Sequence, residues 1–261
     1  MFRIGLKLWS TNTDHYLREA KRLYAEGVFD YIELYVVPES LKFANEWKTL
    51  NIPYVIHAPH SAHGINLADK NCEDRNISIF SEVKEFADVL NAPTIIAHGG
   101  VLGSIDEVAR QINLIGDSRV IVENKPYFPI DNSDRLLAGS TPEEIQRIIT
   151  ATGCGFCFDI GHAVASANAH GVDWKEYFDP FLKLNPKMYH LSDLDISSKK
   201  DQHLHLGTGT LPIKDLIYKI PFSAAISIET KKDCQKNLND FKCDVICLNR
   251  IASFVHGKGG A

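Results

Sequence analysis

The stretch that decides the fold is FCFDIGH, residues 156–162. Its first three residues form a short apolar run of the kind found in buried strands, and the run ends at the carboxylate of Asp159. His162 follows one short turn later. A buried strand that ends in an acid, with an imidazole close behind it, can present two metal-ligand side chains at the mouth of a barrel. Five other segments of the chain end in a similar way.

Strand-like runs alternate with amphipathic helical patterns from one end of the chain to the other, which indicates a parallel sheet built from βα units. The predicted strands are residues 3–9, 31–37, 53–57, 94–98, 119–123, 156–159, 187–191 and 224–229. The predicted helices cover residues 14–26, 38–50 with Pro38 in the first turn, 74–90, 212–220 and 241–254, and two more begin at the N-caps Ser104 and Thr141. A long irregular loop, residues 124–140, follows the fifth strand.

Eight such units in 261 residues predict an α/β fold, a (β/α)8 TIM barrel. We expect one domain, residues 1–255, followed by a frayed tail at residues 256–261.

Composition places few limits on function. With 44% hydrophobic residues the chain can bury a large core. Its net charge of -5 gives no basic signature for nucleic acid, although an acidic protein can still carry a cationic groove.

The first residues, MFRIGLKLWS, contain no secretion signal, and no apolar run approaches the roughly 18 residues that cross a bilayer. We therefore expect a cytoplasmic protein that is not bound to a membrane. Its six cysteines are expected to be reduced, and the CxxC at Cys154 and Cys157 to be structural rather than redox-active or zinc-binding.

The predicted strands three to eight all end in residues that can bind metal ions: His57, His98, Glu123, Asp159, His190 and Glu229. The carboxyl ends of barrel strands are where TIM-barrel enzymes carry their catalytic groups. Imidazoles and carboxylates that converge there suit a divalent cation, and carboxylates at this density would repel one another without one.

The loop after the seventh strand adds the sequence DQHLHLGTG, residues 201–209. In an extended segment Asp201 and His203 would face the same side, because residues two apart do so. Gly207 and Gly209 would let the backbone bend back toward the site. A flexible surface loop would explain the polar composition but not this spacing, so we favour metal binding.

Several motifs resemble those of the xylose isomerase-like barrels, and among these the endonuclease IV family most. The motifs run from strand three to strand eight: HAP (57–59), INL (65–67), AHGG (97–100), VEN (122–124), FDIGHA (158–163), HLSD (190–193), DQHLHLGTG (201–209) and IET (228–230). The most specific of them is the D-x-H-x-x-L-G-x-G element.

The resemblance implies up to three divalent metal ions, usually zinc with manganese or magnesium as alternatives, and hydrolysis of the phosphodiester at abasic sites in DNA. Carried over by motif, the first ion would be held by His57, His98 and Glu123, the second by Glu123, Asp159, His190 and Glu229, and the third by His162, Asp201 and His203. Glu123 and Glu229 are the expected catalytic carboxylates. Such a centre neutralises a phosphate and activates water.

The chain departs from the endonuclease pattern in two places. His60, not His57, keeps the family's spacing to the INL motif, while His57 keeps the HAP context and the strand end; we favour His57 as the ligand. We expect His60, Lys125 and His205 to contact the substrate, and His63 is a further neighbour. The loops after strands two and three contain neither the arginine nor the clear aromatic wedge with which the repair enzymes grip and bend DNA.

Three functions therefore remain open. The first is a phosphodiester hydrolase acting on abasic-site DNA or on a smaller phosphorylated substrate. The second is a sugar or sugar-phosphate isomerase or epimerase with one metal ion on Glu123, Asp159, His190 and Glu229, in which Lys125 and loop 124–140 would cover the substrate. The third is a metal-binding barrel without catalysis. A one-metal isomerase does not need His98, His162, Asp201 or His203 as ligands.

Overall fold

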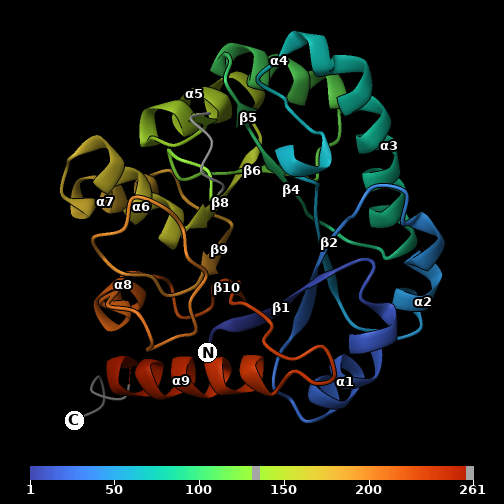
Figure 1. Cartoon of the computed structure of the whole chain (residues 1–261), viewed down its shortest axis with the longest axis vertical. Helices are drawn as coiled ribbons and strands as arrows, with labels where there is room; N and C mark the ends of the chain where they lie inside the picture. Colours follow the sequence, from blue (N-terminus) through green and yellow to red (C-terminus); the bar gives the residue numbers. More distant parts are fainter. Residues whose placement is uncertain (131–135, 257–261) are drawn as a thin grey trace.

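Eight parallel strands close into a barrel, which confirms the predicted TIM-barrel fold (Figure 1). The structure, a computed structural model, describes residues 1–130 and 136–256. Around the barrel the strands follow the order β1-β10-β9-β8-β6-β4-β3-β2. Their bounds are β1 (Arg3–Trp9), β2 (Tyr31–Tyr35), β3 (Tyr54–His57), β4 (Ile95–His98), β6 (Val120–Glu123), β8 (Gly155–Asp159), β9 (Met188–Leu191) and β10 (Ala225–Ile228).

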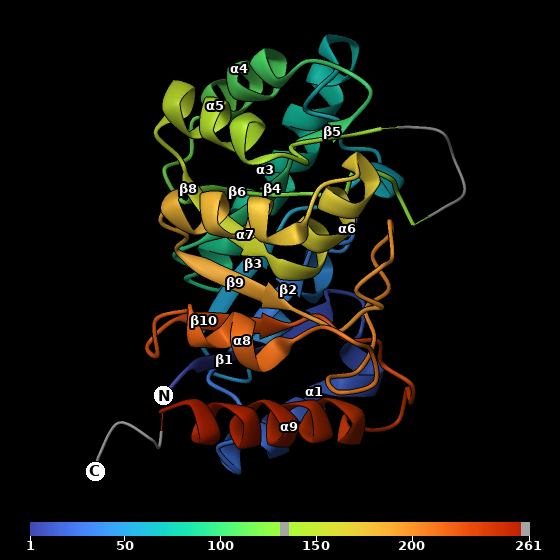
Figure 2. The same cartoon turned by 90° about the vertical axis from the view of Figure 1, so that its left-hand side faces the viewer.

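Helices form a ring around the strands (Figures 1 and 2). They are α1 (Thr13–Ala25), α2 (Ala44–Lys48), α3 (Glu73–Val89), α4 (Ile105–Ile115), α5 (Pro142–Thr152), α6 (Ile160–His170), α7 (Trp174–Lys183), α8 (Ile213–Tyr218) and α9 (Asn239–His256). Three 3-10 helices cover Leu41–Phe43, Ser61–His63 and Lys70–Cys72, and β5 (Gly100–Val101) pairs with β7 (Leu137–Ala138). No helix in the described ranges is both long and apolar enough to cross a bilayer.

The predicted helix starts are confirmed where a capping side chain is present. Ser104 accepts a hydrogen bond from the backbone N–H of Asp106 at the start of α4. Thr141 and Glu144 form a complete capping box at the start of α5, with Pro142 as its first residue. These short polar signals therefore fixed two of the helices that flank the barrel.

Two of the predicted local structures are wrong. The helix expected at residues 38–50 is only the 3-10 turn 41–43 followed by α2, because the backbone N–H groups of Glu39, Ser40 and Leu41 all donate to Glu82 and hold the preceding residues in a loop. The turn expected after Asp159 is instead the first turn of α6, which is capped by the Asp159 carboxylate.

Two other predicted segments are described only in part. Of the predicted tail, only His256 is described, and it ends α9. Within loop 124–140, residues 131–135 lie outside the described ranges.

A small apolar layer fills the barrel below the strand ends. It consists of Tyr31, Ile96, Ile121, Cys157 and Met188. The Tyr31 ring fits because residue 5 is glycine: a Cβ there would lie 2.5 Å from the ring. All six cysteines lie within the described residues and none forms a disulfide. Each of these residues comes before the polar end of its own strand, so the layer lies beneath the polar side chains at the carboxyl ends.

Candidate metal centre

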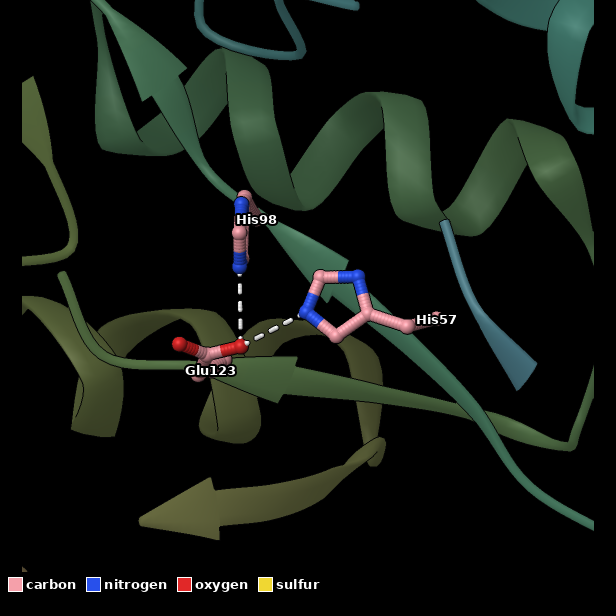
Figure 3. A group of neighbouring side chains, drawn as sticks. All are labelled: His57, His98 and Glu123. Atoms are coloured by element: carbon pink, nitrogen blue, oxygen red, sulfur yellow. Dashed lines mark hydrogen bonds and ion pairs between the residues drawn. The ribbon is translucent and has the colours of Figure 1, made fainter. Parts of the chain in front are cut away.

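The ends of β3, β4 and β6 bring His57, His98 and Glu123 together (Figure 3). Both imidazoles point at one oxygen of Glu123: Nε2 of His57 lies 3.1 Å and Nε2 of His98 2.8 Å from Oε2. All three side chains are buried. The structure therefore places His57, and not His60, in this first group.

A second group lies around His190 at the end of β9. Its Nδ1 is 2.8 Å from Oε1 of Glu229, 3.5 Å from Oε2 of Glu123 and 3.8 Å from Oδ2 of Asp159. Glu123 belongs to both groups, and its other oxygen lies 3.0 Å from Nδ1 of His162. One carboxylate thus connects the first group with the second and reaches toward the third.

The third group contains His162, Asp201 and His203. Oδ2 of Asp201 lies 3.5 Å from Nε2 of His162 and 2.5 Å from Nε2 of His203. His162 reaches this position from the first turn of α6. The D-x-H pair does not lie in an extended segment as predicted, because the backbone at His203 is left-handed, with φ of 50°.

The loop that carries Asp201 and His203 is organised by Asp193. One oxygen of this buried carboxylate accepts hydrogen bonds from the backbone N–H groups of Gly207 and Gly209, and the other accepts from those of Leu194 and Leu211. A Cβ on Gly209 would lie 2.4 Å from the carboxylate. The glycines therefore let the loop wrap around Asp193, rather than bend toward the site as expected.

Hydrogen bonds fix how two of the imidazoles face the centre. Nδ1 of His57 donates to the carbonyl of Ala58 at 2.8 Å, and Nδ1 of His162 donates to the carbonyl of Asn124 at 2.9 Å. A neutral imidazole then has only a lone pair at Nε2, and in both residues that atom faces a carboxylate oxygen. Two acceptors in contact need a proton or a cation between them, so this donor set fits a divalent metal ion.

Unsatisfied buried atoms support the same conclusion. Among the described residues, six buried side-chain atoms lack a hydrogen-bond partner, and all six belong to this site: Glu33 Oε1, His98 Nδ1, Glu123 Oε1, His190 Nδ1, Asp201 Oδ2 and His203 Nε2. Asp201 Oδ2 and His203 Nε2 lie at ion-pair distance from each other without the alignment of a hydrogen bond, and His190 Nδ1 lies in the same way near Glu229 Oε1. Native proteins leave few such atoms, and groups of them indicate an ion-binding site.

The surroundings lower the pKa of two imidazoles of the site and raise the pKa of a third. Burial, with the cations of Lys7 and Lys125 nearby, lowers the pKa of His57 and His98. Burial also disfavours a charge on His162, but Asp159 and further carboxylates outweigh it and raise the pKa of His162 to about 10. Burial raises the pKa of Asp159 to about 6. In the absence of a metal ion, a proton on His162 therefore offsets part of the carboxylate charge.

A cavity of about 700 Å³ opens over the three groups. His60 and Lys125 line it, as expected of substrate contacts, whereas His63 and His205 are not among its lining residues. The His205 ring lies between the carboxylates of Asp233 and Asp244, at 3.0 and 2.9 Å, and its contact with a substrate stays a prediction. Trp9, which the sequence did not single out, also lines the cavity.

The family model of the xylose isomerase-like TIM barrel matches residues 18–248. The chain belongs to the xylose isomerase-like TIM barrel family. It is 27% identical over 248 residues to the probable endonuclease 4 of Geobacter sulfurreducens, covering 84% of this chain and 80% of the relative. Its fold is similar to that of a D-tagatose 3-epimerase-like protein (TM-score 0.74, 21% identity, 98% of this chain and 99% of the other). The fold is also similar to that of endonuclease IV from Thermus thermophilus (TM-score 0.65, 18% identity, covering 95% of this chain and 99% of the other). The predicted resemblance is thereby confirmed.

Two charged residues of this xylose isomerase-like barrel were missed from the sequence. Lys7 on β1 contacts Glu229 and lies 3.1 Å from Glu33 on β2. Glu33, His57 and Glu229 also place ligand atoms within 4.8 Å of one another. The Lys7 ammonium lies between the two acids of this set, Glu33 and Glu229, and supplies positive charge there. The available signal was a charged residue inside an apolar strand, as in RIGLKLW and YIELY.

Proposed function

We propose that this protein is a divalent-metal-dependent hydrolase of phosphate esters that uses up to three cations, with zinc the expected ion. His57, His98 and Glu123 would hold the first, and His162, Asp201 and His203 the third. Glu123, Asp159 and His190 would hold the second together with Glu229, whose Oε1 lies 2.8 Å from His190 Nδ1. The observation that carries the proposal is the third group. A one-metal isomerase does not need these residues as ligands, yet the three side chains converge and leave Asp201 Oδ2 and His203 Nε2 without hydrogen-bond partners.

The cavity favours a compact anionic substrate. About 700 Å³ is the size of a small-molecule site. Its lining includes Lys7, Lys125, Lys231 and Lys232, and among the described lining residues there is no arginine. Lys7 is paired with Glu33 and Glu229, but Lys125, Lys231 and Lys232 also place positive charge along the cavity, which suits a phosphate group. A small phosphate ester is therefore the preferred substrate class, with abasic-site DNA as the larger member of the same chemistry.

In this reaction the residues of the site would have separate roles. When bound, the cations would neutralise the phosphate and lower the pKa of a water molecule. Glu229 and Glu123 both lie close to His190 Nδ1 and can accept hydrogen bonds from the attacking water and orient it. Lys125, whose Nζ is 3.9 Å from Glu123 Oε1, is placed to contact the phosphate. His60 borders the same cavity and can contact the remainder of the substrate.

A second function, sugar or sugar-phosphate isomerisation or epimerisation, fits the same cavity, which has the size of a small-molecule site and no arginine among its described lining residues. The fold is also similar to that of an epimerase-like protein. In this case one cation on Glu123, Asp159, His190 and Glu229 would suffice, and Glu123 and Glu229 would exchange protons with the substrate.

Metal content and activity together test the proposal. Purified protein reconstituted with zinc is expected to hold close to three equivalents, and His203→Ala to lose one. The reconstituted protein should hydrolyse bis-p-nitrophenyl phosphate, and Glu229→Gln should lower the rate by at least about 100-fold. An oligonucleotide with one abasic site tests DNA separately. One equivalent of zinc in the wild-type protein, together with conversion of a ketose such as tagatose, would replace the hydrolase with the epimerase.

A further inference from the structure

Glu33 meets the one imidazole nitrogen of His190 that faces away from the candidate metal centre. Nε2 of His190 donates to Oε2 of Glu33 at 2.9 Å, while Nδ1 points to the oxygens of Glu229 and Glu123. Both Glu33 and His190 are fully buried. With its proton held on Nε2, a neutral His190 has its lone pair on Nδ1, the atom that the centre would use.

Glu33 is itself held in place from other strands of the barrel. Ser227 on β10 donates its hydroxyl to Oε2 of Glu33 at 2.5 Å, and Tyr31 contacts that hydroxyl at 3.0 Å. Lys7 on β1 lies 3.1 Å from the other oxygen. Since β2 and β9 are not neighbours in the barrel, the contact between Glu33 and His190 crosses the barrel interior. A network of this kind fixes the direction of a side chain more tightly than one hydrogen bond would.

The other two imidazoles with a defined outer partner differ from His190. His57 and His162 donate to backbone carbonyls, whereas His190 donates to a charged carboxylate. A carboxylate partner makes an imidazole a stronger metal ligand as well as orienting it. His190 lies in the group that either candidate reaction would need, so its partner acts on the central ion.

We propose that Glu33 is a positioning residue that holds His190 with Nδ1 toward the central cation and strengthens it as a ligand. The inference rests on the proposed metal-dependent function but applies equally to the hydrolase and the epimerase. In this role Glu33 touches neither the substrate nor the reacting atoms; it acts through His190.

The test uses the full-length chain, stripped of metal and titrated with Co²⁺ against a competing chelator. Glu33→Gln keeps the shape and removes the charge, and we expect it to weaken Co²⁺ binding about 10–100-fold and to shift the visible d–d absorption. The matched control is Glu82→Gln, whose carboxylate accepts three backbone hydrogen bonds outside the site. This control should lower stability and leave both Co²⁺ affinity and spectrum unchanged.

Each outcome decides the inference. Co²⁺ binding by Glu33→Gln within about twofold of the wild type, with an unchanged spectrum, overturns it. If Glu33→Gln does not fold, Ser227→Ala removes a single donor to Glu33 and should weaken Co²⁺ binding about 3–10-fold; unchanged binding again overturns the inference. A wild-type chain that binds no Co²⁺ rejects the metal-dependent function itself, and the two failures are therefore distinguishable.

Discussion

Asp193→Asn should open the loop that carries two of the three side chains of the third group. Each oxygen of the Asp193 carboxylate accepts two backbone hydrogen bonds, one oxygen from Gly207 and Gly209 and the other from Leu194 and Leu211. An asparagine has one acceptor oxygen, so whichever way its amide is turned, an NH₂ group faces two N–H donors.

The loss follows from that geometry. A buried hydrogen bond to a charged group contributes about 1.5–3 kcal/mol, so two of them give about 3–6 kcal/mol. We expect a lower free energy of unfolding in urea, faster hydrogen exchange in residues 193–211, and loss of one metal equivalent from the reconstituted protein. The control is Asp195→Asn, whose carboxylate is exposed and accepts hydrogen bonds from Ser197, and which should change none of these quantities. A change below about 1 kcal/mol with normal exchange in the loop would refute the reasoning.

Three further predictions concern the centre. Chelation should lower the melting temperature by about 5–10 °C, because without a cation the buried carboxylates face one another, and adding zinc should restore it. A thermal scan that shows the same melting temperature with and without chelator would speak against a filled site. Zinc binding near pH 7 should release protons, because the raised pKa of His162, about 10, keeps it protonated until the ion displaces the proton. Zinc affinity should therefore rise with pH, about tenfold per unit for each proton released, and calorimetry in buffers of different ionisation enthalpy should detect the protons; a pH-independent affinity contradicts this. Asn124→Ala removes two bonds to the Asp159 backbone, at 2.9 and 2.8 Å, and should cost about 2–4 kcal/mol in urea unfolding, whereas a cost under about 1 kcal/mol would show that this bridge is not needed.

The order of the eight barrel strands and of most of the helices could be predicted from the sequence because each of these elements carries its own local signal, whereas α6 and α7 were not predicted. Apolar runs marked the eight barrel strands, and Ser104 and Thr141 marked two helix starts through their own side chains. Parallel strands joined by helices place all their carboxyl ends on one side, so topology predicted that the strand-end side chains converge, while the grouping of His57, His98 and Glu123 was implied by the family resemblance. The roles of these residues as ligands stay predictions.

Contacts between strands distant in the sequence could not be predicted in this way. Glu33 and Lys7 sit in apolar strands, and nothing local indicates that they meet Ser227, His190 and Glu229 inside the barrel. The two glycines of the DQHLHLGTG element looked like flexible points, but it is Asp193, outside the element, that shapes the loop.

The stretch 156–162 shows the division most clearly. The sequence alone predicted that a buried strand ends in Asp159, because a short continuous apolar run is typical of a strand that is buried on both faces of a parallel barrel. The family resemblance implied that His162 belongs to a different group of ligands, but that Asp159 also caps α6, and so starts the helix that carries His162, was seen only in the folded structure. The physical reason is that ligand position depends on helix direction and on loop 192–211, which are set by packing between segments far apart in the chain.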